Sequence, residues 1–101
     1  MFFVGIDIGK NKHVASMMDD TGKVVFKAFS FPNTSDGGNA LFLKLTSYSL
    51  NPSDFEIGME ATGHYWLSVY SFLFEKSFLL HVINPDRWMA QGDGNPQTQK
   101  R

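Results

Sequence analysis

The chain has 101 residues, of which 43% are apolar and ten are phenylalanine, and its formal net charge is −1. This length fits one domain, and the composition is that of a globular α/β protein. The lack of cysteine excludes disulfides and thiolate metal sites. No apolar run approaches the ~18 residues of a membrane span and no basic leader is present, so we expect a cytoplasmic protein without a membrane partner. The charge neither indicates nor excludes nucleic acid.

The first stretch, Met1–Lys12, predicts a strand that contains one anomalous acid. It reads MFFVGIDIGKNK, and its aromatic and β-branched residues are typical of a strand buried on both faces. Asp7 stands where an aliphatic residue is expected, and a buried carboxylate must be hydrogen-bonded, paired or metal-bound. Gly5 and Gly9 bracket it and allow a ligand to approach.

Two further strands and a helix follow. The spacing predicts strands over His13–Met18 and Lys23–Phe31, and connections this short join antiparallel neighbours. Thr34 or Ser35 then caps a helix that ends near Leu50–Pro52, with Gly37-Gly38 weakening its first turn. Its inner face is expected to carry Leu41, Phe42, Leu45 and Tyr48.

The second half alternates strand, helix and strand. Ser53–Met59 is predicted as a buried strand that delivers Glu60 at its end. A helix over Tyr65–Lys76 and a strand over Phe78–Ile83 complete the order βββαβαβ. This α/β order predicts a ribonuclease H-like fold with a five-stranded mixed sheet, strand order 3-2-1-4-5, and helices on its faces.

In that fold Asp7 and Glu60 face one another at the carboxyl ends of neighbouring parallel strands, where α/β sheets bind ligands. Two adjacent carboxylates either share a proton or hold a divalent cation, and oxygen ligands favour Mg²⁺ or Mn²⁺. Two such metals support in-line attack at a phosphodiester. The alternative is a hydrogen-bonded structural Asp7 and a surface Glu60.

The other polar and aromatic candidates have ordinary structural explanations as well. Lys10 and Lys12 could contact a phosphate backbone or be solvated turn residues, and His64 could assist the site or simply begin a helix. We expect the remaining histidines, His13 and His81, to be ordinary strand residues. Base stacking and core packing are both open for the aromatic residues of the second helix, which are Tyr65, Trp66 and Tyr70.

Three segments resemble the N-terminal domain of the DEDD-type insertion-sequence transposases, which include the Piv-type invertases and are RuvC-like in fold. The segments are GIDIGKNKH (Gly5–His13), EATGHYW (Glu60–Trp66) and VINP (Val82–Pro85). The resemblance implies DNA transposition and recombination with a two-metal Mg²⁺ site, with Asp7 and Glu60 as the first two catalytic acids and metal ligands. It also implies DNA as substrate, a structured guide RNA, a homo-oligomer of the full-length protein, and a bacterial or archaeal source.

The third and fourth acids of the family lie in a basic Lys-Asp-x-x-Asp stretch beyond the VINP strand. Here the chain instead reads DRWMAQGDGNPQTQKR, so Asp86 and Asp93 are assigned no role. Reading one base later permits a basic segment, and we interpret residues 86–101 as an irregular, out-of-frame tail after an incomplete domain over residues 1–85. A fragment with half of the acids is expected to be inactive alone.

Two other functions fit parts of the sequence. GIDIG also resembles the opening of actins, sugar kinases and Hsp70 chaperones, which predicts an ATP-binding fragment, but the chain lacks the Gly-rich adenosine loop and the second phosphate loop of that superfamily. The remaining alternative is a non-catalytic interaction module on the same fold.

Overall fold

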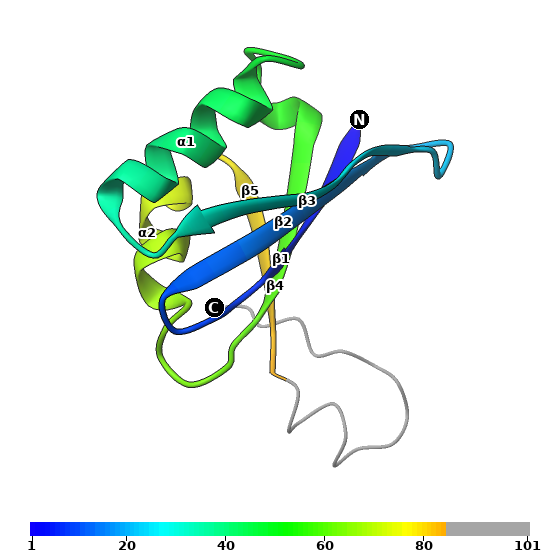
Figure 1. The fold of residues 1–101 in the computed structure, drawn as a ribbon. Coiled ribbons are helices and arrows are strands. Elements are labelled where there is room, and N and C mark those ends of the chain that lie inside the picture. The colour runs from blue at the N-terminus through cyan, green and yellow to red at the C-terminus, as the bar shows by residue number, and fades with distance from the viewer. Residues whose placement is uncertain (85–101) are drawn as a thin grey trace, which may run out of the picture.

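The computed structural model describes residues 1–84 and contains one mixed sheet with two helices (Figure 1). The elements in chain order are β1 (Phe2–Asp7), β2 (Lys12–Asp19), β3 (Val24–Pro32), α1 (Ser35–Thr46), a 3₁₀ turn η1 (Pro52–Asp54), β4 (Phe55–Glu60), α2 (Leu67–Glu75) and β5 (Leu79–Ile83). Every predicted strand and helix is present. The predicted tail over residues 86–101 lies outside the described residues. Neither helix of the described part is long and apolar enough to cross a membrane.

The sheet has the predicted order, β3-β2-β1-β4-β5. The first three strands form an antiparallel meander, while β4 runs parallel to β1 and β5 runs parallel to β4. Parallel pairing follows from the two helical crossovers, because a helix between two strands returns the chain to the same end of the sheet. The α/β fold with five strands in the order 3-2-1-4-5 is therefore confirmed.

Both helices lie on one face of the sheet, which corrects the prediction of helices on its two faces (Figure 1). The crossovers run in the same direction, from β3 to β4 and then from β4 to β5. Two crossovers of the same hand and direction must lie on the same side of a sheet. The opposite side, called here the open face, carries the alternate residues of each strand.

The strands consequently bury one set of side chains rather than two. On β1, Val4 and Ile6 are buried under the helices, whereas Phe3, Gly5 and Asp7 are exposed on the open face. The prediction of a first strand buried on both faces is thus wrong for the described part of the chain. The core lies between the two helices and the face of the sheet that they cover. It includes Val4, Ile6, Ala15, Met17, Phe31, Leu41, Leu45, Phe55, Ile57, Met59, Val69, Leu73, Phe78 and Val82.

Both helices are shorter than predicted, α1 at its C-terminal end and α2 at both ends. Leu41 and Leu45 are fully buried on α1 as expected, but the helix ends at Thr46. Tyr48 lies beyond that end, is 40% exposed and packs its ring against Phe2, so its assignment to the inner helix face is wrong.

Candidate functional site

Asp7 and Glu60 close two neighbouring parallel strands. In the ladder between β1 and β4, Ile6 is paired with Met59, and each acid is the next residue of its strand. Both residues are exposed, and both follow a buried apolar residue because side chains alternate along a strand. The register therefore brings together the two residues that the sequence predicted as a pair.

The two acids line a single depression on the open face, with a volume of about 590 Å³. Gly5 and Gly58 are paired with one another two residues before the acids and also line it. A Cβ atom at Gly5 would lie 3.9 Å from the Ser16 hydroxyl oxygen, and one at Gly58 would lie 4.0 Å from the His81 carbonyl oxygen. These are ordinary contacts, so packing does not require either glycine, and their effect is to leave the depression without side chains at its centre.

The donors around the depression suit a hard divalent cation. Two carboxylates and the Thr62 hydroxyl are oxygen donors of the kind that Mg²⁺ binds, and Mg²⁺ keeps several water ligands where a protein supplies few. Within residues 1–84 no cluster of three or more histidine, aspartate and glutamate residues forms a fuller metal site. The described residues thus fit part of a metal coordination sphere.

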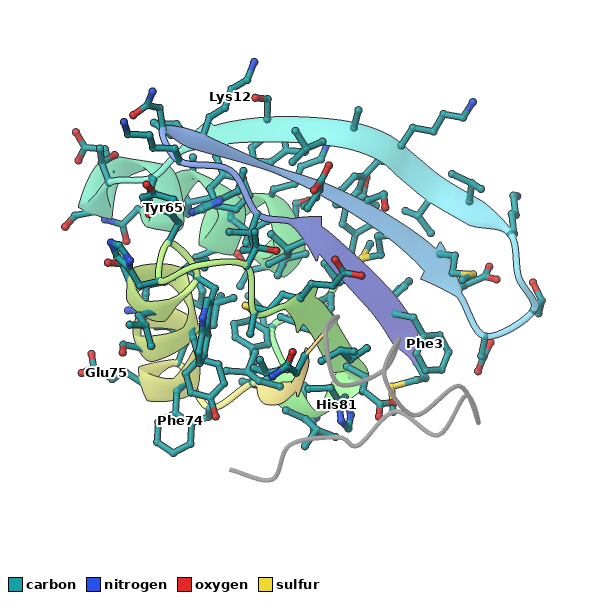
Figure 2. The ribbon with its side chains drawn as sticks, turned by 90° about the horizontal axis from the view of Figure 1, so that it is seen from below. Phe3, Lys12, Tyr65, Phe74, Glu75 and His81 are labelled. Atoms are coloured by element: carbon teal, nitrogen blue, oxygen red, sulfur yellow. The ribbon has the colours of Figure 1, made fainter. Side chains whose placement is uncertain are left out.

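The predicted nucleic-acid contacts lie around this end of the sheet, but they do not line the depression. Lys10 is exposed on the connection from β1 to β2, and Lys12 is exposed at the first position of β2, where it extends away from the sheet (Figure 2). His64 is exposed in the loop from β4 to α2, where its ring lies 4.8 Å from that of Tyr65 between centroids. Tyr65 and Trp66 precede α2 rather than forming part of it, and Trp66 and Tyr70 pack against the core.

Several functional features were missed at the sequence level. Thr62 lines the depression, and its N–H donates to the Glu60 carbonyl oxygen at 3.0 Å. His81 occupies a strand position on β5, as predicted, and its Nε2 atom also contacts the Glu56 carboxylate at 2.6 Å. A glycine stands two residues before each acid, at Gly5-x-Asp7 and Gly58-x-Glu60. This repeated pattern is the sequence signal that could have predicted a depression with bare backbone beside the two acids.

Comparisons with known proteins give one family assignment. A family model for DEDD-type IS110 proteins, described as a transposase, matches residues 4–101. No curated protein matches the sequence. Among solved structures, the chain is similar to a member of the Ppx/GppA protein family from Aquifex aeolicus, with 12% identity and a TM-score of 0.43. That match covers 86% of this chain and 36% of the other.

Proposed function

Since this chain belongs to the family of DEDD-type IS110 transposases, we propose that it supplies part of a metal-dependent site for cleavage and transfer of DNA strands. Asp7 and Glu60 are its metal ligands and first two catalytic acids. The observation that carries the proposal is the register of β1 and β4, in which the two acids follow a directly paired couple, Ile6 and Met59.

The carboxylates have a defined task in this proposal. When bound, Mg²⁺ or Mn²⁺ at such a site activates the attacking oxygen and stabilises the leaving oxygen of a phosphodiester. Asp7 and Glu60 hold the cation at the strand ends, and the bare backbone of Gly5 and Gly58 leaves room for the ligands that the protein does not provide. The two carboxylates that residues 1–84 bring to the depression are fewer than a pair of cations requires, so we expect the chain alone to bind metal without cleaving DNA.

The nucleic acid approaches, in this proposal, over the end of the sheet that carries the acids. Lys10 and His64 are exposed in loops that flank those strand ends, Lys12 is exposed at the start of β2, and all three would contact the phosphate backbone. Substrate DNA is the proposed partner of these residues, with a structured guide RNA and further copies of the full-length protein as partners of the complete assembly.

Titration of the chain with Mn²⁺ tests the proposed metal site. We expect Asp7→Asn and Glu60→Gln each to weaken Mn²⁺ binding by about tenfold or more, because each removes one charged oxygen ligand from the cation. Isothermal titration calorimetry measures this directly, and circular dichroism checks that each variant is folded.

Glu75→Gln is the matched control, because Glu75 is an exposed carboxylate on α2 that does not line the depression. It should bind Mn²⁺ as the native chain does. Equal Mn²⁺ affinity in all four proteins would contradict the metal site and favour the non-catalytic interaction module.

A further inference from the structure

His13 on β2 is buried beneath the helices with half of its hydrogen-bonding capacity unused. The residue is 1% exposed and packs edge-on against Phe31, with ring centroids 5.4 Å apart. The Gly9 N–H donates to its Nδ1 at 3.2 Å, whereas Nε2 meets no partner among the described residues. In the neutral ring the proton then resides on Nε2, so the unpartnered group is a donor.

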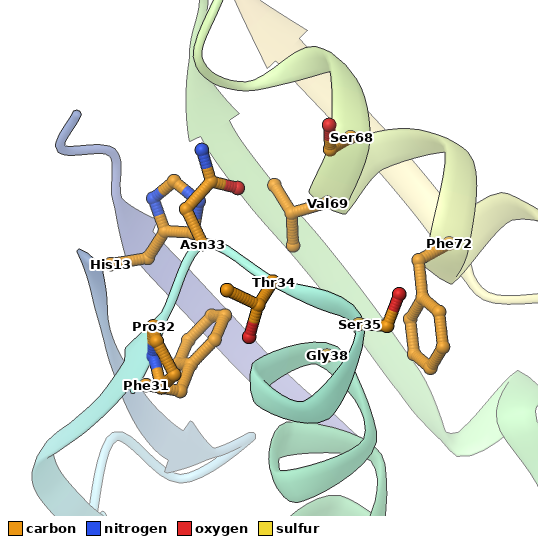
Figure 3. A pocket seen from close by; sticks show the side chains of 10 residues that line it. All are labelled: His13, Phe31, Pro32, Asn33, Thr34, Ser35, Gly38, Ser68, Val69 and Phe72. Carbon is orange, nitrogen blue, oxygen red and sulfur yellow. The ribbon is translucent and has the colours of Figure 1, made fainter. Parts of the chain in front are cut away.

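His13 lines a small cavity between the sheet and its two helices (Figure 3). The cavity has a volume of about 80 Å³, several times the ~10–15 Å³ that one water molecule needs. Figure 3 shows the His13 ring beside the Asn33 side chain, with Ser35 and Ser68 contributed by the two helices. Its ten lining residues include no aspartate or glutamate.

The N-terminal ends of both helices also line this cavity, α1 through Ser35 and Gly38 and α2 through Ser68 and Val69. Helix α2 has no side-chain cap. Leu67 and Tyr70 donate their N–H groups to the carbonyls of preceding residues, but within the described chain no acceptor meets those of Ser68 and Val69. Helix N-termini carry partial positive charge and free N–H donors, which suit an anion.

From these donors we infer that the cavity binds a phosphate oxyanion. A neutral imidazole N–H, serine hydroxyls and uncapped helix N–H groups all donate hydrogen bonds, and the tetrahedral oxyanion offers acceptors in several directions. The ligand is either free inorganic phosphate or one phosphodiester group of a nucleic-acid strand. The inference is separate from the metal site, because these donors lie on the other face of the sheet.

An NMR titration of the ¹⁵N-labelled full chain, with chelator present, tests the inference. The probes are inorganic phosphate, dimethyl phosphate as a diester, and sodium chloride at matched ionic strength. We expect saturable shifts of the His13 Nε2 signal and of the Ser68 and Val69 amides with phosphate and none with chloride. Saturation by inorganic phosphate alone identifies the free ion, whereas saturation by dimethyl phosphate as well identifies a nucleic-acid diester as the source.

His13→Phe keeps a ring against Phe31 and removes the Nε2 donor, so phosphate binding should weaken by about tenfold or more. Ser68→Ala, at an exposed helix position, should weaken binding severalfold without disturbing the core. His81→Phe, a histidine exchange on the open face, should retain the native affinity. Absence of saturable shifts up to ~50 mM phosphate would overturn the inference and leave a cavity filled by water. Equal phosphate affinity of the native chain, His13→Phe and Ser68→Ala would overturn it as well.

Discussion

At Gly37, in the first turn of α1, the helix backbone lies directly against the end of β3. The Thr34 hydroxyl caps the helix by accepting from the Gly37 N–H at 3.0 Å. A Cβ atom at Gly37 would lie within 1.8 Å of the Pro32 carbonyl oxygen, a distance that no real contact reaches. Helix propensity alone disfavours this glycine at the helix start, but the close approach to Pro32 requires it for the helix to pack.

Gly37→Ala tests this close approach. The helix start must move away from Pro32, which should lower the free energy of unfolding by about 2–3 kcal/mol despite the better helix propensity of alanine. Urea unfolding followed by circular dichroism measures the loss. Asn39→Ala, at an exposed position of the same helix, is the control and should be neutral or slightly stabilising. An unfolding free energy of Gly37→Ala equal to that of the native chain would contradict the close approach, because it would show that a Cβ atom fits beside Pro32.

The acidic pair could be predicted from sequence because a single acid stands out against an apolar strand. The buried state of His13 could not, since over residues 13–18 each face of β2 carries one polar residue among apolar ones. His13, Ala15 and Met17 alternate with Val14, Ser16 and Met18, and neither set is clearly the polar one. Only the position of the helices decides that the first set is buried, and that position is a property of the whole sheet.

At the scale of elements, the turn between β2 and β3 is organised around one carboxylate. The Asp19 Oδ1 atom accepts from the Thr21 hydroxyl at 2.6 Å and from the N–H groups of Thr21 and Lys23 at 2.9 and 3.0 Å. The Thr21 hydroxyl is the main cause that lowers the pKa of Asp19 below its ordinary value, followed by the two N–H groups. All of these bonds favour the ionised carboxylate.

Thr21→Val should raise the pKa of Asp19 toward its ordinary value. In the native chain the lowered pKa contributes stability that is complete above the unfolded pKa of about 4 and is lost as the pH falls through the folded pKa. The variant should therefore lose less stability on acidification below about pH 4. A ¹³C NMR titration of the Asp19 carboxyl measures the shift. Thr46→Val is the control, because the native Thr46 hydroxyl donates to the Leu43 carbonyl and not to Asp19. It should leave the pKa of Asp19 unchanged.

For the whole molecule, the order of the strands explains why both helices lie on one face of the sheet. Both crossovers pass from β3 toward β5, and the usual right-handed connection then places them on the same side. The order 3-2-1-4-5 was predictable from the meander and the two helices, and this consequence of handedness follows from it. Exposed large apolar residues remain on the open face, namely Phe3, Met18, Val24 and Leu79 (Figure 2 shows Phe3).

Neighbouring methionines on β2 provide a test of this one-sided core. Met17 is 2% exposed beneath the helices, while Met18 is 46% exposed on the open face. Met17→Thr should cost about 2 kcal/mol or more in unfolding free energy, because it removes buried apolar volume and adds a hydroxyl. Met18→Thr should change stability by no more than about 0.5 kcal/mol, since threonine suits an exposed strand position.

Urea unfolding of both variants at several protein concentrations distinguishes the two faces. A large loss for Met17→Thr alone supports a core that lies only between the sheet and its helices. A comparable loss for Met18→Thr would contradict it, because the open face would then be covered in solution. If that second loss shrinks on dilution, the cover is another copy of the chain, since the stability of an associated state depends on protomer concentration.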